Sequence, residues 1–252
     1  MKITTLSEKE IELLARLEYE GREIYTRNEI TSLCKSNEMA NYLIKKMLEK
    51  GRLKKVIKNI YILIPMKAPH GKWSVNEYLV AKALARNADY YIGYASVFNS
   101  YGFTDQVSQM IYIVNNKYSF AKTIFGVRYK LKKVLSNRLY GLENRKIGKE
   151  DVAFPKKERA IIDAFEYYDI KRAYQILQNQ LNLIDKNMLI EYLSKYPVQI
   201  IRRRIGYYLE QLGVNKKMLS KIQVGDKGYS PLYKNYPQKG ELNDRWRIII
   251  NG

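Results

Sequence analysis

The chain has 252 residues, of which 46% are hydrophobic, and it carries a formal net charge of +20 from 45 Lys and Arg against 25 Asp and Glu. This composition excludes a disordered chain, because there is ample apolar area for a core, and the length allows one large domain or two ordinary ones. The positive charge attracts polyanions and predicts nucleic acid as the partner, although a Lys-rich composition bias of the source organism would give the same sum.

The sequence carries no signal for export, membrane insertion or zinc binding. At the N-terminus, Glu8, Glu10 and Glu12 fall where a signal peptide needs an apolar core, and no run elsewhere reaches membrane-spanning length. Cys34 is the single cysteine and His70 the single histidine, so an internal disulfide is excluded and the usual zinc ligands are missing. We therefore expect a cytoplasmic protein with no cofactor and no metal.

Three successive helices are predicted in the first fifty residues. The capping boxes SEKE, from Ser7, and TRNE, from Thr26, start the first two, because Ser or Thr followed by Glu satisfies two free amides at a helix start. Ser36 or Asn37 caps the third helix, NEMANYLIKKMLEK, which carries an apolar stripe and ends at Gly51.

Two β-rich runs follow, RLKKVI and IYILI, joined by a turn at Lys58 and Asn59. Three helices and a hairpin in this order predict a winged helix-turn-helix over residues 1–67, with the third helix in the major groove and the hairpin along the phosphates. The charge agrees, since residues 1–40 carry 6 basic and 8 acidic groups whereas residues 41–67 carry 8 basic and 1 acidic.

The predicted DNA contacts are polar side chains of the third helix and of the hairpin. Asn41 and Lys45 share one face of the helix, and Asn37 lies one turn earlier. Asparagine can pair with adenine and lysine with guanine. The complete set is Asn37, Asn41, Tyr42, Lys45, Lys46, Lys54, Lys55, Lys58 and Asn59. An ordinary solvated lysine face on a small helical domain is the alternative reading of this charge.

A second domain is predicted over residues 68–252. The stretch PMKAPHGK, residues 65–72, contains two prolines and a glycine and predicts a linker, and a third capping box, SVNE at Ser74, opens a new helix. β-rich runs such as QMIYIVN and TIFGVRYKLKKV then precede a helical second half that extends to about Ile222. The predicted fold class is therefore α+β, with the winged helix followed by a larger mixed domain.

Three stretches of this second domain resemble one family. The segment YYIGYASVFNSYGFTDQVSQMIYIVNNK, from Tyr90, resembles the segment after the winged helix in AbiEi-type antitoxins, and RRRIGYYLEQLG and YSPLYKNYPQKGELNDRWRIIIN resemble the same family. The resemblance implies a protein that represses its own operon by binding operator DNA and that neutralises a nucleotidyltransferase-like toxin. Some members occur without a toxin gene, so a stand-alone transcriptional regulator stays open.

Basic groups outside the predicted winged helix have several readings. Residues 117–150 hold 10 basic and 2 acidic groups, which could extend the DNA footprint, contact an acidic toxin or simply be solvated. Residues 202–204 are three arginines that we expect to fan around the surface of a helix, although a purely structural role for this helix and for the C-terminal stretch is the alternative. The further DNA or partner contacts predicted here are Lys130, Lys132, Lys133, Arg202, Arg203, Arg204 and Arg245.

Enzymatic readings find weaker support in the sequence. No GxSxG elbow accompanies the single histidine, and no GxxxxGK[ST] phosphate loop occurs. A metal-dependent nuclease would need clustered carboxylates, and the candidates do not form the pattern of an Asp followed by a Glu-x-Lys strand. Those candidates are Asp89, Asp105, Glu143, Glu150 and Asp151. We therefore predict a protein that is not an enzyme.

Overall fold

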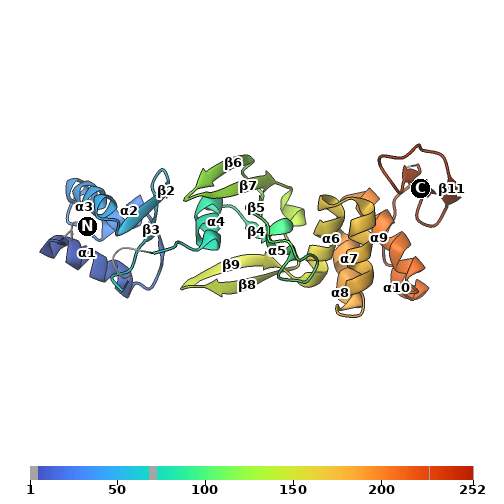
Figure 1. Cartoon of the computed structure of the whole chain (residues 1–252), viewed down its shortest axis with the longest axis horizontal. Coiled ribbons are helices and arrows are strands. Elements are labelled where there is room, and N and C mark those ends of the chain that lie inside the picture. Colours follow the sequence, from blue (N-terminus) through green and yellow to red (C-terminus); the bar gives the residue numbers. More distant parts are fainter. Residues whose placement is uncertain (1–4, 68–72, 227, 252) are drawn as a thin grey trace.

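The computed structural model describes residues 5–67, 73–226 and 228–251. It has a mixed α+β fold, as the sequence predicts. Figure 1 shows an elongated molecule along which the chain runs from end to end, with small helices and a hairpin first, larger sheets in the middle, and helices with short strands last. No helix within the described ranges is long and apolar enough to cross a membrane.

The N-terminal part, residues 5–67, contains the expected three helices and hairpin. The helices are α1 (Glu8–Tyr19), α2 (Arg27–Ser32) and α3 (Asn37–Glu49). The strands are β1 (Ile24–Thr26), β2 (Leu53–Ile57) and β3 (Ile60–Leu63), in the order β1-β3-β2. Strand β1 is an addition to the sequence prediction, and it pairs antiparallel with β3.

Local capping explains where these helices begin. The carboxylate of Glu10 accepts a hydrogen bond from the Ser7 amide at 2.6 Å, and Glu29 does the same for Thr26 at 2.6 Å, so both capping boxes are confirmed. The Ser36 hydroxyl accepts from the third amide of α3 at 3.2 Å.

The central part, residues 73–155, is built around a four-stranded sheet with the order β4-β5-β7-β6. Its strands are β4 (Tyr90–Gly93), β5 (Met110–Asn115), β6 (Phe120–Ile124) and β7 (Val127–Lys133), and only the β5–β7 pair is parallel. The other elements are α4 (Glu77–Ala85), α5 (Ala95–Phe98), a 3-10 turn (Ser136–Arg138) and the hairpin β8 (Leu142–Ile147) with β9 (Glu150–Pro155). The predicted cap of α4 is corrected, because Asn76 rather than Ser74 caps the helix and accepts from the Tyr78 amide at 2.8 Å.

The C-terminal part, residues 156–251, is helical first and ends in three short strands. The helices are α6 (Lys157–Tyr167), α7 (Ile170–Gln180), α8 (Lys186–Lys195), α9 (Gln199–Gln211) and α10 (Lys216–Leu219). The strands β10 (Ser230–Pro231), β11 (Glu241–Asn243) and β12 (Ile248–Ile250) pair in the order β10-β12-β11.

Two apolar cores hold the fold together, and the hairpin β2–β3 contributes to both. The smaller core lies within the N-terminal part, whereas the larger one contains Val56, Ile57 and Ile62 together with residues of the central and C-terminal parts. Helix α4 packs against both hairpin strands and against β5 and β7. The N-terminal and central parts therefore share buried surface. The linker predicted over residues 65–72 falls largely outside the described residues, and His70 with it.

The buried carboxylate of Glu150 adds polar contacts across the same junction. Its Oε1 accepts from the amides of Glu23 at 3.0 Å and Ile24 at 3.4 Å, and its Oε2 pairs with Lys82 at 2.8 Å. Burial raises the pKa of Glu150, but the hydrogen bonds from Lys82 and the two amides outweigh this and lower it. Glu150 is therefore a charged anchor between β1 and α4.

Candidate nucleic-acid interface

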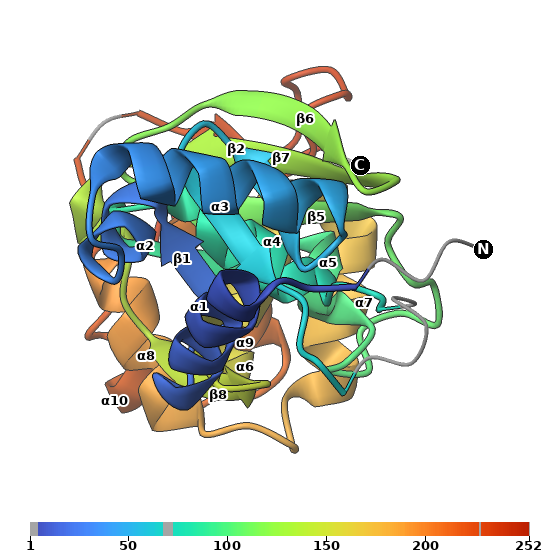
Figure 2. The ribbon, with the colours of Figure 1, turned by 90° about the vertical axis from the view of Figure 1, so that its left-hand side faces the viewer.

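Helix α3 presents a polar face because its apolar residues are spaced for burial on the other side. Ala40, Leu43, Ile44 and Met47 are buried, whereas Asn37, Asn41, Tyr42 and Lys45 are exposed. Figure 2, which looks at the N-terminal end, shows α3 along the upper side of the molecule, the side on which β6 and β7 also lie. The α3 residues predicted to contact DNA therefore lie on the solvent side of the helix.

Neighbouring side chains orient two residues of this face. The guanidinium of Arg27, at the start of α2, donates a hydrogen bond to Asn41 Oδ1, so Nδ2 is the atom of that amide open to a ligand. Lys46 is half-buried and forms an ion pair with Glu49 at 3.1 Å, whose hydrogen bond and charge raise the pKa of this lysine. Lys45 is exposed beside them.

The hairpin residues predicted to contact DNA differ in their surroundings, because some face solvent and one contacts the protein. Lys55 and Lys58 are exposed, and Asn59 sits at φ 62° in the turn, a conformation that asparagine adopts more readily than most residues. Lys54 differs, because its Nζ donates to the carbonyl of Trp73 at 3.2 Å and lies 5.4 Å from the centre of the Phe125 ring. Lys54 thus joins the hairpin to the central part.

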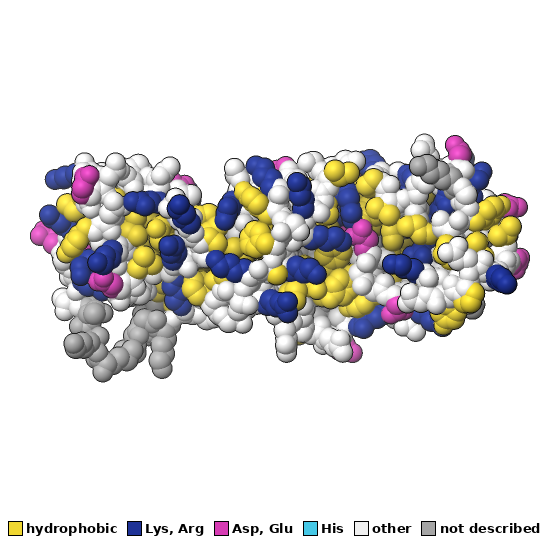
Figure 3. Space-filling model, turned by 90° about the horizontal axis from the view of Figure 1, so that it is seen from above, with side chains coloured by type: hydrophobic (Ala, Val, Ile, Leu, Met, Phe, Trp, Pro, Cys, Tyr) yellow, Lys and Arg dark blue, Asp and Glu magenta, His cyan; other side chains and the backbone are white. Residues whose placement is uncertain are grey.

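Strand β7 forms a second basic surface by simple alternation. Tyr129 and Leu131 are buried, so Arg128, Lys130 and Lys132 point to the opposite face of the sheet. Figure 3 looks onto the upper side of the molecule and shows Lys and Arg side chains gathered over both the N-terminal and the central part. The two basic regions therefore lie on one side of the protein.

The lysines of β7 differ in how firmly they are held. Lys130 is exposed, with its Nζ 5.9 Å from the centre of the Tyr112 ring. Lys132 is half-buried, because its Nζ donates to the Tyr94 hydroxyl at 2.7 Å and lies 3.4 Å from Glu166. Lys133 is exposed, and its place in the strand turns it toward the face opposite Lys132.

An ionic network beneath this face fixes β7 to the helices. Glu166 Oε1 pairs with Arg138 at 2.6 Å, and its Oε2 accepts from the Tyr94 hydroxyl at 2.6 Å. Burial acts to raise the pKa of Glu166, but the hydrogen bond from Tyr94 and the charges of Arg138 and Lys132 lower it to about 2. Nearby, Arg159 pairs with Asp163 at 2.5 Å in a fully buried ion pair. The basic strand is thus joined to α6 by a largely buried ionic network.

The arginines of α9 are not a surface fan, and this expectation is corrected. Arg203 is only 2% exposed and donates to the carbonyls of Val224 at 2.9 Å and Gly228 at 2.8 Å. Arg204 is half-buried and donates to the Pro231 carbonyl at 2.9 Å, and Arg202 is half-buried as well. The buried Arg203 ties the C-terminal segment to α9, because it satisfies carbonyl groups of an irregular chain.

The two C-terminal stretches that carry the family resemblance pack on each other. Trp246 is buried, its Nε1 donates to Glu210 Oε2 at 2.6 Å, and its ring covers Gly206 so closely that a Cβ there would collide with it. Arg245 pairs with the other oxygen of Glu210 at 2.6 Å. These contacts favour a structural role for Arg245 and Trp246.

The structure does not bring the five candidate nuclease carboxylates together. Glu150 accepts from the amides of Glu23 and Ile24, Asp151 pairs with Lys146 at 2.9 Å, and Glu143 pairs with Arg145 at 2.8 Å. Among residues 5–67, 73–226 and 228–251, no group of three or more His, Cys, Asp or Glu could hold a metal ion.

Two basic residues of this surface, Arg27 and Arg128, are not among the contacts predicted from the sequence. Arg27 belongs to the TRNE capping box, and its place beside Asn41 depends on how α2 packs against α3. Arg128 could have been found, because the run VRYKLKK alternates basic and apolar residues in the way of a half-buried strand.

Comparisons with known proteins add information on the fold alone. No family model matches the chain, and no curated protein matches it. Among solved structures, it is similar to the crystal structure of the RV2827C protein from Mycobacterium tuberculosis, with a TM-score of 0.61 and 13% sequence identity. The similarity covers 97% of this chain and 92% of that chain, so the order of parts is shared along nearly the whole length.

Proposed function

We propose that residues 1–67 are a winged helix-turn-helix and that the protein is a DNA-binding transcriptional repressor. Helix α3 would enter the major groove and the β2–β3 hairpin would be the wing. The order of three helices and a hairpin, with α3 packed on α1 and α2, supports this assignment. The observation that carries it is the common side of the molecule on which α3 and the basic strand β7 lie.

The side chains of this surface suit two kinds of DNA contact. Asn41 and Lys45, exposed on α3, can reach base edges, where an asparagine and a lysine discriminate adenine and guanine. Lys55 and Lys58 on the hairpin, and Lys130 on β7, are exposed lysines that suit phosphates, which add affinity without sequence information. The central part would thus lengthen the footprint beyond the winged helix.

The family resemblance implies which DNA the protein binds and that it has a second partner. By that resemblance, the DNA is the operator of the protein's own operon, and the residues from 68 onward neutralise a nucleotidyltransferase-like toxin. A stand-alone regulator differs only in lacking that toxin. Co-expression with the product of the adjacent gene separates the two, because only an antitoxin restores the growth of cells that the neighbouring product inhibits.

A salt series tests the electrostatic part of the proposal. Fluorescence anisotropy with duplex DNA from the region upstream of the gene should give a slope of log K against log salt of about −4 to −5 if about five phosphates are neutralised. The double variant Arg128→Ala, Lys130→Ala should make the slope shallower by about 2. Lys216→Ala with Lys217→Ala is the matched control, because it removes the same charge from α10 at the other end of the molecule. A wild-type slope near zero would refute DNA binding.

A further inference from the structure

A cavity of about 520 Å³ lies far from α3, between α6, α7, α9 and the C-terminal segment. Its walls include the side chains of Phe165 and Ile170, both buried, and the rings of Tyr233 and Tyr236. The volume falls within the range of about 300–1,000 Å³ that small-molecule sites have. The cavity is therefore large enough for one small ligand.

Three cationic side chains line this cavity without forming ion pairs. They are Lys171, Arg204 and Lys234, and no ion pair within the described residues involves them. Arg204 uses one guanidinium nitrogen for the Pro231 carbonyl, while its Nε is a buried atom with no hydrogen-bond partner there. Positive charge in the cavity is thus left uncompensated.

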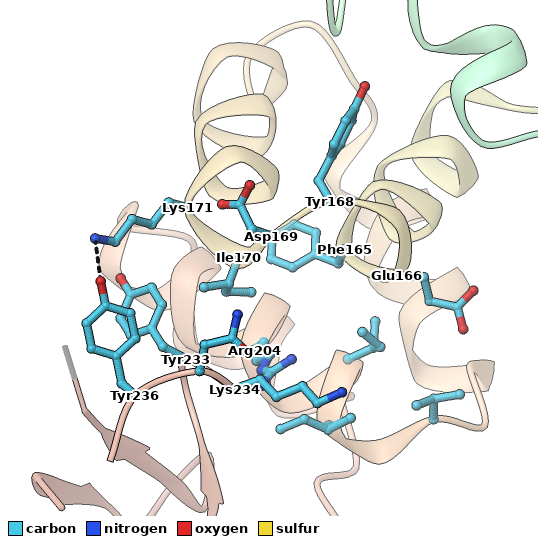
Figure 4. A pocket seen from close by; sticks show the side chains of 14 residues that line it. Phe165, Glu166, Tyr168, Asp169, Ile170, Lys171, Arg204, Tyr233, Lys234 and Tyr236 are labelled. Carbon is cyan, nitrogen blue, oxygen red and sulfur yellow. Dashed lines mark hydrogen bonds between the residues drawn. The ribbon is translucent and has the colours of Figure 1, made fainter. Parts of the chain in front are cut away.

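The two acidic residues of the lining are already engaged. Glu166 pairs with Arg138 at 2.6 Å, and Asp169 accepts from the Arg172 amide at 3.0 Å as the cap of α7. Figure 4 shows both carboxylates pointing away from Arg204. Neither carboxylate forms an ion pair with Lys171, Arg204 or Lys234, so these cations keep their charge for an anionic ligand.

Aromatic rings supply flat surfaces beside these cations. The rings of Tyr233 and Tyr236 lie with their centres 5.5 Å apart, and Lys171 lies 5.6 and 5.5 Å from these centres and 3.4 Å from the Tyr236 hydroxyl. Figure 4 shows these two rings and Lys171 together on one wall, with Phe165 on another. A flat ring system can stack on such a wall.

We infer that this cavity binds a nucleoside monophosphate, whose phosphate lies at Arg204 and Lys234 and whose base stacks on Tyr233 or Tyr236. A guanidinium and an ammonium are the usual partners of phosphate, and a tyrosine face accepts any base. This function goes beyond repression and does not rest on it, because the cavity lies in the C-terminal part of the molecule, away from the α3 end.

Isothermal titration calorimetry on the full chain tests this inference with AMP, GMP, CMP and UMP. At least one nucleotide should bind one to one and more tightly than inorganic phosphate or the matching nucleoside, because charge and ring both contribute. The variant Lys234→Ala should weaken binding about tenfold or more, the usual effect of losing a charged contact with the phosphate. Lys171→Ala should weaken it less, because Lys171 lies beside the rings of Tyr233 and Tyr236. Both lysines are exposed, so the variants should fold.

Two controls assign the site. Lys239→Ala removes an exposed lysine of the same segment outside the cavity lining, and Arg128→Ala with Lys130→Ala alters the proposed DNA surface, so neither should change nucleotide affinity. The inference is overturned if none of the four nucleotides saturates the protein up to about 10 mM. It is equally overturned if Lys171→Ala and Lys234→Ala bind as the wild type does, or if phosphate alone binds as tightly as the nucleotides.

Discussion

Replacement of Glu166 by glutamine would test the ionic network that supports β7. The carboxylate pairs with Arg138 at 2.6 Å and accepts from Tyr94, and both it and the arginine are largely buried. Its pKa is lowered from 4.5 to about 2, which corresponds to about 3 kcal/mol of folding free energy at neutral pH. Glu166→Gln keeps the shape but leaves Arg138 without its counter-charge, so we expect a loss of about 3 kcal/mol at pH 7.

The pH dependence of the same variant has a defined sign. Because the folded pKa of Glu166 lies below the unfolded value, its contribution is complete above about pH 5 and is lost as the pH falls toward 2. The difference in unfolding free energy between wild type and Glu166→Gln, measured by urea denaturation, should therefore shrink over this window. A variant within about 0.5 kcal/mol of the wild type at pH 7 would refute the reasoning.

Two further outcomes follow from the packing. Gly206→Ala should lower the free energy of unfolding by about 1–3 kcal/mol, because the added methyl group meets the Trp246 ring. Gly228→Ala is the control, because the space around Gly228 is open, and it should stay within about 0.5 kcal/mol of the wild type. Equal stabilities of the two variants in urea or thermal unfolding would contradict the packing of Trp246 on Gly206. A fragment of residues 73–252 should unfold cooperatively but at a lower temperature than the corresponding part of the full chain. The reason is that Glu150 loses the amide of Glu23 and α4 loses the apolar residues of the β2–β3 hairpin. A calorimetric midpoint unchanged from that of the full chain would contradict the shared core.

Local sequence signals predicted the three helices and the hairpin of the N-terminal part. The Ser7 amide donates to Glu10, and Thr26 and Ser36 accept from amides, in each case three residues along the chain. The apolar stripe of α3 depends only on helical spacing, so both signals can be read from the sequence. Strand β1 could not, because its three residues become a strand only by pairing with β3. Long-range pairing has no local signature.

The residues of the candidate sites show the same difference between local signals, which can be read from the sequence, and long-range contacts, which cannot. The exposure of Asn41 and Lys45 followed from the helical pattern, and the exposure of Lys130 follows from the alternation of its strand. The burial of Arg203 was missed, because the carbonyls that it satisfies belong to an irregular segment that folds back from a later part of the chain. The anchoring role of Glu150 was missed as well, since its amide partners, Glu23 and Ile24 at the start of β1, are far away in the sequence.

The proposal that α3 reads DNA is tested most directly by the affinity of Asn41→Ala with Lys45→Ala for duplex DNA from upstream of the gene. Anisotropy should show a loss of about 2–6 kcal/mol, because each good base contact is worth about 1–3 kcal/mol if the two are additive. Both side chains are exposed, so the thermal midpoint should stay near that of the wild type, and Lys216→Ala with Lys217→Ala should bind normally. A folded double variant with unchanged affinity would contradict the assignment of α3 as the helix that reads DNA.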